Sequence, residues 1–349
     1  MTDSNPLVFY DISSVIQPRS YAPNPSKARL ALGFKRVPFK TTFVDLLDIS
    51  TVRKGLNCPA TRKLDDGSDF HTLPMLQDPS ADDKVIGDSF DIANYLEDTF
   101  PNSGGCLFPQ DSTHTGLDYE SPNKDTMFFA PLTLNEGAKN EAYAKFNTHV
   151  DATFSSHVVL VAQYMPFNPE TAEAVKAQMC QRAHLESWES ICIQGEAREQ
   201  LKVAFKAALK SLADLFTVHD EGPFLEGEKA NYADLIVGGW INMMAKCMPK
   251  EEWEDFRTWH GGVFGSLHDA LQENDDAAEL VTFPAHFRSP GLQLFDLLHQ
   301  LIKPASEFSY CFSRNHSRAK LTLSEPKCFL REAYKVSASA NEYSGVEAE

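Results

Sequence analysis

Short apolar runs and helical repeats alternate along the first hundred residues. Four runs of apolar and aromatic residues predict strands, at 6–12, 38–44, 71–77 and 84–87. Three stretches carry apolar residues three and four positions apart and predict helices, at 27–34, 49–55 and 90–98. Loops are expected between them, the longest at 13–26 and 60–69. The predicted order of elements is therefore β-α-β-α-β-β-α.

This order is typical of an α/β domain whose sheet contains both strand directions. Alternating strands and helices favour a parallel pair, whereas the short turn at 79–83 predicts an antiparallel last pair. Pro74 stands inside one predicted strand, where it cannot donate a hydrogen bond to a neighbouring strand. Its presence predicts a special geometry, such as a cis peptide bond before it.

The pattern becomes purely helical after about residue 125. Five stretches have apolar residues near i, i+3 and i+4 and predict a helical bundle, at 140–163, 170–194, 196–218, 233–246 and 251–272. We therefore expect an α/β domain over 1–108, a linker over 109–125, an all-helical domain over 126–280 and a tail over 281–349. The tail is polar and lacks stable periodicity, so we expect it to be poorly ordered. The alternative is a tail helix docked on the bundle.

Composition narrows the functions to consider. Of the 349 residues, 42% are apolar and 23% charged, which is ordinary for a globular protein, but the formal net charge is −17. A surface this acidic repels phosphate backbones and anionic lipid, so neither nucleic acid nor a membrane is an expected partner. No apolar stretch approaches the ~18 residues of a membrane span, and the polar first residues lack a signal-peptide pattern.

Cysteines and histidines do not predict a metal site. The seven cysteines form no CxxC pair, and no two of the eleven histidines lie four residues apart. We expect the scattered thiols to be reduced, which indicates a cytoplasmic protein.

Three motifs resemble those of the cytosolic glutathione transferases. Thr72-Leu73-Pro74 resembles the element with a cis-proline, and the run from Gly87-Asp88-Ser89 to Leu96 resembles the acidic-serine motif and its helix. The third motif lies late in the predicted helical bundle, at 222–225 and 231–234, and resembles the family's motif with a capping box. The resemblance implies a thioredoxin-like α/β N-terminal domain followed by an all-α helical-bundle C-terminal domain. It covers roughly residues 6–275.

A wider stretch narrows this resemblance further. Residues 23–49 and 66–70 are similar to fungal members related to bacterial lignin β-etherases, some of whose relatives belong to secondary-metabolite gene clusters. The resemblance then implies a homodimer that uses glutathione as co-substrate.

The implied glutathione pocket lies around Leu73-Pro74 and Asp88-Ser89. With a cis Leu73–Pro74 bond, the backbone of Leu73 would pair with the cysteinyl unit of glutathione as an added strand does; the alternative is a trans proline on an edge strand. Ser89 would bind the γ-glutamyl carboxylate at a helix N-terminus, and Asp88 or another acid would hold the ammonium. The alternative for both residues is a helix cap alone.

Because glutathione is anionic and the protein is acidic, the pocket must supply local donors. The glycine carboxylate has only weak candidate partners, which are Lys40, Arg62, Lys63 and His71. The alternative for Arg62 and Lys63 is a solvated pair.

The group that activates the glutathione sulfur is the hardest to assign. In the similar fungal proteins the loop reads like Ser-Pro-Asn-x-x-Lys-x-Arg, with the serine as activating hydroxyl, whereas here Ala22 stands in its place. Lowering a thiol pKa from ~8.5 to ~6.5 takes about 2.7 kcal/mol, and a hydrogen bond to a charged group supplies ~1.5–3 kcal/mol. Asn24 is our first candidate donor and catalytic residue. Ser26, followed by Ser20 and Tyr21, is a substitute by proximity.

The implied activity is that of a glutathione transferase. Glutathione thiolate would attack a small hydrophobic electrophile or cleave an aryl ether, in secondary metabolism or detoxification. Candidates to line the second-substrate pocket are the aromatic residues near the domain junction, Phe128, Phe129, Phe146 and Tyr164. Because no cysteine precedes Cys58, a cysteine-dependent thiol transferase is not expected. The alternative, which Ala22 favours, is a glutathione-binding or scaffold protein without turnover.

Overall fold

The computed structural model describes residues 6–16, 20–64, 66–114, 130–133, 137–219 and 221–275. The expectations for the tail over 281–349 and for Phe128 and Phe129 lie outside these residues, as does most of the expected linker.

A four-stranded mixed sheet forms the centre of the N-terminal domain. Its strands, in the order β2-β1-β5-β6, are β2 (Phe39–Val44), β1 (Leu7–Ile12), β5 (Met75–Asp78) and β6 (Lys84–Ile86). β1 and β2 are parallel, and the other two pairs are antiparallel. The mixed directions predicted from the order of elements are confirmed. Pro74 precedes β5 rather than lying within it, and the Leu73–Pro74 bond is cis, as predicted.

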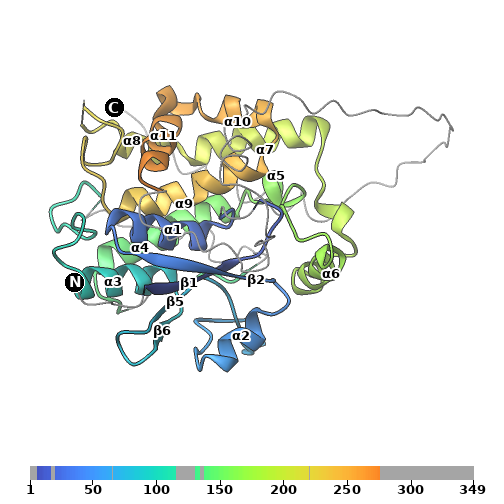
Figure 1. The fold of residues 1–349 in the computed structure, drawn as a ribbon. Helices are drawn as coiled ribbons and strands as arrows, with labels where there is room; N and C mark the ends of the chain where they lie inside the picture. Colours follow the sequence, from blue (N-terminus) through green and yellow to red (C-terminus); the bar gives the residue numbers. More distant parts are fainter. Residues whose placement is uncertain are drawn as a thin grey trace, which may run out of the picture.

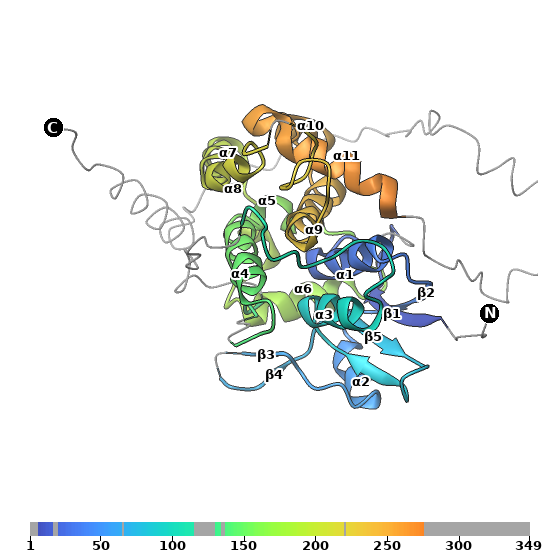
Figure 2. The same ribbon diagram turned by 90° about the vertical axis from the view of Figure 1, so that its left-hand side faces the viewer.

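Three helices flank this sheet in two layers. α1 (Pro23–Phe34) and α3 (Ser89–Thr99) lie on one face, and α2 (Ile49–Gly55) lies on the other (Figure 1). Figure 2 shows the same layers after a quarter turn. The guanidinium of Arg29 on α1 bonds Asp11 of β1 and Thr41 of β2, which fastens the helix to the sheet.

The first helix begins four residues earlier than its apolar periodicity predicts. The structure starts α1 at Pro23, so the expected loop over 13–26 is wrong at its end. Prolines are compatible with the first helical turn, because the N–H that proline lacks has no intrahelical acceptor there. Asn24 and Ser26 therefore lie in the first turn of α1 and not in a loop.

The expected loop over 60–69 contains two short strands. β3 (Arg62–Lys63) and β4 (Asp69–Phe70) pair as an antiparallel hairpin, separate from the main sheet. Two-residue strands are too short to show an alternating pattern, so the pattern of residues did not predict them.

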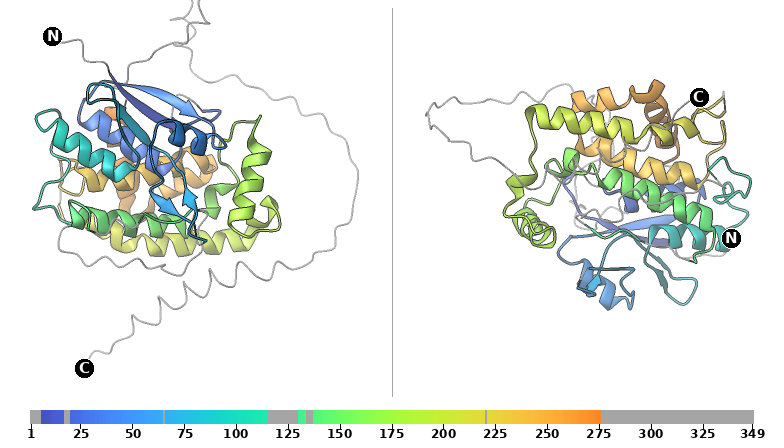
Figure 3. Two further views of the ribbon diagram at one scale, coloured as in Figure 1. Left: turned by 90° about the horizontal axis from the view of Figure 1, so that it is seen from below. Right: turned by 180° about the vertical axis from the view of Figure 1, so that it is seen from behind.

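In the described part of the second domain the regular elements are helices, as predicted, apart from two isolated bridges among residues 224–229. The long helices are α4 (Glu141–Ser155), α6 (Ala172–Arg182), α7 (Gly195–Ala208), α9 (Tyr232–Cys247) and α11 (Val263–Asp275). The shorter ones are α5 (Val159–Ala162), η1 (Trp188–Ile191), α8 (Lys210–Leu215), α10 (Lys250–Phe256) and η2 (Trp259–Gly262). Figure 3 shows most of this domain on the side of α1 and α3, whereas α6 lies beside the sheet. Asn168 and Thr171, just before α6, donate to Asp45 ahead of α2.

Two of the expected helices, those at 170–194 and 251–272, are interrupted where the backbone enters left-handed conformations. His184 has φ 50° in the break between α6 and η1. His260, Gly261 and Gly262 all have positive φ between α10 and α11. An α-helix cannot continue through such residues. Each of these two predicted stretches therefore contains more than one helix.

The two domains share a continuous apolar core along α1 and α9. A Cβ on Gly239 of α9 would lie 2.6 Å from the Lys27 side chain and 2.7 Å from the Pro23 carbonyl, so glycine allows α9 to approach the start of α1. The capping box predicted at the start of α9 is confirmed: Asn231 accepts from the Ala233 N–H, and Asp234 accepts from the Asn231 N–H. Burial raises the pKa of Asp234 to about 7.

Candidate functional site

A buried arginine organises the two predicted binding motifs. Arg53 on α2 is fully buried, and its guanidinium donates to three main-chain carbonyls, those of Pro59, Thr72 and Gly87. Thr72 immediately precedes Leu73, and Gly87 immediately precedes Asp88. Arg53 therefore holds the cis-proline turn and the start of α3 in one frame.

Close packing around Arg53 explains the glycine before Asp88. A Cβ on Gly87 would lie 2.1 Å from Nη2 of Arg53 and 2.7 Å from Sγ of Cys58. Cys58 is itself buried and accepts from Arg53 at 3.2 Å. Burial raises the pKa of its thiol, against the opposing effect of Arg53. A raised pKa disfavours the nucleophilic thiolate, which supports the structural role expected for this cysteine.

The start of α3 carries both a cap and uncommitted donors. Oδ1 of Asp88 accepts from the Phe90 N–H at 2.8 Å, which is the predicted N-cap. Tyr232 of α9 donates its hydroxyl to the Ser89 carbonyl at 3.0 Å, so the helical domain also contacts this turn. Among the described residues, neither the hydroxyl nor the N–H of Ser89 has a hydrogen-bond partner.

The backbone of Leu73 is similarly uncommitted. Its side chain is buried, but its N–H and C=O make no hydrogen bond to any residue in the described part of the chain. A main-chain donor and acceptor in this state can pair with an extended peptide.

A short segment of the connection between the domains contacts the same site. Nε of Arg62 donates to Oγ1 of Thr133 at 2.7 Å, and Nη1 of Arg62 donates to the Pro131 carbonyl at 3.0 Å. The Thr133 hydroxyl in turn lies 3.4 Å from Oδ2 of Asp88, which is the carboxylate oxygen that does not take part in the N-cap. Of the cations considered for binding, Arg62 is thus close to Asp88, whereas Lys63 pairs with Asp69 at the surface.

The start of α1 has no hydroxyl at residue 22, and it has a side-chain amide at residue 24. Ala22 is the N-cap and contributes no side-chain cap. Oδ1 of Asn24 accepts from the ammonium of Lys27 at 3.0 Å. The Nδ2 amide of Asn24 has no partner among the described residues. Ser26 is buried and accepts from Nδ2 of Asn242 at 2.8 Å.

Lys27 joins the start of α1 to the helical domain. Its side chain has no exposed area, and its ammonium also donates to Asn147 at 2.8 Å and to Asp151, both on α4. Trp240 of α9 donates to the same Asp151 oxygen at 2.6 Å. Burial lowers the pKa of Lys27, whereas Asp151 raises it; Arg62 and Asp88 act on it more weakly, in opposite directions.

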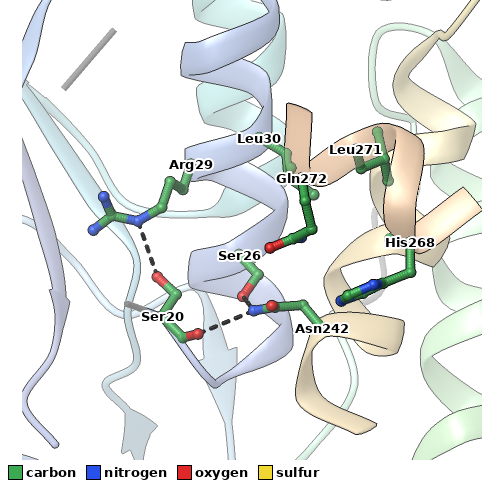
Figure 4. Close-up of a pocket in the computed structure, with 9 residues that line it drawn as sticks. Ser20, Ser26, Arg29, Leu30, Asn242, His268, Leu271 and Gln272 are labelled. Carbon is green, nitrogen blue, oxygen red and sulfur yellow. Dashed lines mark hydrogen bonds between the residues drawn. The ribbon is translucent and has the colours of Figure 1, made fainter. Parts of the chain in front are cut away.

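A small cavity lies on the other face of α1 (Figure 4). It is lined by Ser20, Ser26, Arg29, Leu30, Gly238, Asn242, His268, Leu271 and Gln272. Asn242 donates to both the Ser20 carbonyl and the Ser26 hydroxyl, which joins the loop before α1 to α9. None of Leu73, Asp88 or Ser89 lines this cavity, so it is separate from the predicted binding motifs.

Two of the aromatic candidates for the second-substrate pocket lie within the described residues. Phe146 is fully buried against His114, so assigning it to the pocket is wrong: its ring is part of the core. Tyr164 is 43% exposed, beside Arg198. Within the described ranges there is no group of acidic, histidine or cysteine residues that suits a metal ion. None of the helices described is long and apolar enough to cross a membrane.

Sequence patterns did not point to Arg53, Lys27 or Thr133. Arg53 stands beside Lys54 and resembles a solvated basic pair. Lys27 matches the lysine of the loop Ser-Pro-Asn-x-x-Lys-x-Arg, but that match does not reveal that its side chain is buried or what it binds. Thr133 comes from a connection with no regular pattern, so only the tertiary structure brings it beside Asp88.

Comparison with protein families gives two matches in the expected order. The glutathione S-transferase N-terminal domain matches residues 21–99, and the glutathione S-transferase C-terminal domain matches residues 143–273. Together these segments span more than half of the chain and contain the cis-proline turn, the start of α3 and most of the helical domain.

Several of the similar proteins come from fungi. A glutathione S-transferase-like protein, ustS, from Aspergillus flavus is 24% identical over 78% of this chain and 92% of its own. The crystal structure of a Ceriporiopsis subvermispora glutathione S-transferase in complex with glutathione is 25% identical, covers 80% of this chain and all of its own, and has a TM-score of 0.63. Glutathione transferase GSTFuA3 of Phanerochaete chrysosporium has the same fold at 24% identity and a TM-score of 0.61, with 80% of this chain and all of its own covered. On its sequence, domain order and fold, the chain belongs to the glutathione S-transferase superfamily.

Proposed function

We propose that this protein binds glutathione and transfers it, as a thiolate, to a small hydrophobic electrophile. The observation that carries the proposal is that Arg53 donates hydrogen bonds to the carbonyls of both Thr72 and Gly87. These bonds fix the position of the Leu73 backbone relative to that of Ser89. In this proposal the backbone of Leu73 pairs with the cysteinyl unit, and the hydroxyl and N–H of Ser89 bind the γ-glutamyl carboxylate.

Local charge supports an anionic ligand despite the net charge of −17. Arg62 and Lys27 lie near enough to Asp88 for their charges to interact. Arg62 attracts the carboxylates of glutathione, and Asp88 attracts its ammonium, whereas the charge of Lys27 is paired with Asp151. Thr133 lies between Arg62 and Asp88, so in this proposal its hydroxyl contributes to the ligand site.

The Asn24 amide is the proposed donor to the sulfur. Its Nδ2 lacks a partner among the described residues and sits in the first turn of α1, where the helix N-terminus favours negative charge by ~0.3–1 kcal/mol. The thiol releases its proton to solvent. The sulfur then forms a bond to carbon, while the bond to the leaving group, such as an aryl ether oxygen, breaks with its electron pair. Ser26 ranks behind Asn24 because it is buried and lines the separate cavity that Leu73, Asp88 and Ser89 do not line.

The test is a pH titration of glutathione bound to the protein, followed by thiolate absorbance. We expect thiolate at pH 7 in the natural protein and a bound-thiol pKa higher by ~1–2 units in Asn24→Ala, because that change removes a hydrogen bond of ~1.5–3 kcal/mol. Ser26→Ala is the matched control and should titrate as the natural protein does. Absence of thiolate at pH 7 in the natural protein would overturn the transferase proposal.

A glutathione-binding or scaffold protein without turnover is the second candidate. Ala22 favours it, because this residue has no hydroxyl where the similar fungal proteins carry the activating serine. The two candidates differ in one measurement: a scaffold binds glutathione as the neutral thiol, with a pKa near its ordinary value. Gain of thiolate in Ala22→Ser would then indicate that only the hydroxyl is missing.

We further propose a homodimer that acts in the cytoplasm on a hydrophobic second substrate, in secondary metabolism or detoxification. Family membership supports the assembly, and sedimentation of the purified chain tests it. Turnover of a panel of quinones, epoxides and aryl ethers tests the substrate class, and inactivity on all three would contradict it.

A further inference from the structure

Lys27 is the only described lysine whose ammonium meets the proposed sulfur donor. Its three N–H groups have three acceptors, which are Asn24 on its own helix and Asn147 and Asp151 on α4. The side chain is completely buried, so water does not compete for these bonds. All three N–H groups of the ammonium are therefore used in hydrogen bonds, and one of these bonds is to Asn24.

A carboxamide that accepts at its oxygen must present its nitrogen elsewhere. With Oδ1 of Asn24 on Lys27, the two N–H groups of Nδ2 form the free end of the side chain. The flipped amide would set those N–H groups against the ammonium, donor against donor, and would present an acceptor to the sulfur. A thiolate needs a donor, so only one of the two orientations serves the reaction.

The helical domain fixes Lys27 in turn. Asp151 receives Lys27 and Trp240 on the same oxygen, and Asn147 donates to its other oxygen at 3.3 Å. Asn147 and Asp151 are four residues apart on α4, hence on one face of the helix. Gly239 lets α9 approach the Lys27 side chain closely.

We propose that Lys27 is a positioning residue that holds the Asn24 amide with its N–H groups toward the glutathione sulfur, and that Asp151 and Asn147 of the helical domain set the position of Lys27. This inference rests on the proposed glutathione site and extends it. The orientation of the sulfur donor in one domain is thereby decided by side chains of the other.

A double-mutant cycle with Lys27→Met and Asn24→Ala tests the proposal, with the pKa of bound glutathione thiol as readout. We expect Lys27→Met alone to raise that pKa by ~1 unit or more, because the amide loses its orientation. In the Asn24→Ala background the same change should have no further effect, since Lys27 acts through Asn24. Equal shifts in both backgrounds, or none in either, would overturn the proposal.

The matched control is Lys35→Met. Lys35 ends the same helix, is equally buried, and bonds Glu97 and the Gly105 carbonyl away from Asn24. Its loss should destabilise the fold and leave the thiol pKa unchanged. Should Lys27→Met alone fail to fold, the cycle is run with Asp151→Asn added, which removes the unpaired buried charge and keeps an acceptor for Trp240.

A second readout does not require thiolate to form. The side-chain amide signal of Asn24 in nitrogen-15 NMR, assigned by its absence in Asn24→Ala, should move when glutathione binds the natural protein and should move much less in Lys27→Met. The same movement in both proteins would overturn the positioning role. Binding without thiolate in the natural protein overturns the transferase function but leaves this readout intact, whereas no binding at all overturns both.

Discussion

Two buried cations organise the two halves of the candidate site in different ways. Arg53 donates to main-chain carbonyls of its own domain, at Pro59, Thr72 and Gly87. Lys27 donates only to side chains, and two of its three acceptors belong to the helical domain. The half that would hold the peptide of glutathione therefore depends on the path of the backbone, and the half that would activate its sulfur depends on residue identity.

This difference has a consequence for how each half tolerates substitution. Every residue supplies a carbonyl, so Thr72 and Pro59 can change without removing an acceptor of Arg53. No such tolerance exists at positions 24, 147 and 151, where the acceptor is the side chain itself. Binding and activation of glutathione are consequently expected to respond to different mutations.

Arg53→Met should have the largest effect and should break the peptide-binding half. Loss of the guanidinium leaves buried carbonyls without donors, at ~1–3 kcal/mol each. We expect the free energy of unfolding to fall by ~3–5 kcal/mol and the glutathione Kd to rise more than about 100-fold, as the two binding motifs lose their common frame. Denaturant unfolding and calorimetry measure the two quantities.

Lys54→Met is the control for that change. Lys54 is the exposed neighbour of Arg53 on α2, so its replacement should alter stability by less than ~0.5 kcal/mol. An Arg53→Met protein that folds and keeps its affinity within threefold would contradict the role of the frame.

His114 belongs to neither half of the candidate site, and its burial predicts how the stability of the fold changes at acid pH. Burial lowers the pKa of His114 to about 4, with Glu226 opposing. Because the unfolded state binds the proton more tightly, stability is lost as pH falls from ~6.5 towards 4, by up to about 3 kcal/mol from this group. His114→Gln should lack this component while keeping the glutathione Kd at neutral pH.

Denaturant unfolding of both proteins between pH 4 and 7 measures that difference. Asp234, whose pKa is raised to about 7, titrates in the opposite sense, but it is present in both proteins and cancels. Parallel pH curves for the two proteins would refute the assignment, and a changed Kd would place His114 within the site.

Ser89→Ala should have the smallest effect and should sharpen the comparison. The hydroxyl has no partner among the described residues, so its removal should change the melting temperature little. One hydrogen bond to a ligand carboxylate is worth ~1.5 kcal/mol, so the glutathione Kd should rise about tenfold. Ser80→Ala, in the turn between β5 and β6, is the control and should leave the Kd unchanged. An unaltered Kd in Ser89→Ala would remove Ser89 from the binding site.

Much of the fold was predictable because its signals are local. The cis bond at Leu73–Pro74, the cap at Asp88 and the capping box at Asn231 follow from patterns within a few residues, and the mixed sheet follows from the order of such local elements. The errors also have local causes. The prolines in the first turn of α1 interrupt its apolar periodicity, so that turn was predicted as a loop. Left-handed residues end two helices at points where the apolar periodicity of the sequence continues.

The sequence by itself thus determined the domain order, the family and the two motifs that would hold a peptide. Tertiary structure alone decided which charges are buried and what they bind. Lys27 meets Asp151 from 124 positions away, and Arg53 meets Gly87 from 34 positions away. Partners so distant in the chain leave no periodic trace, because packing of helices and strands, and not local spacing, brings them together.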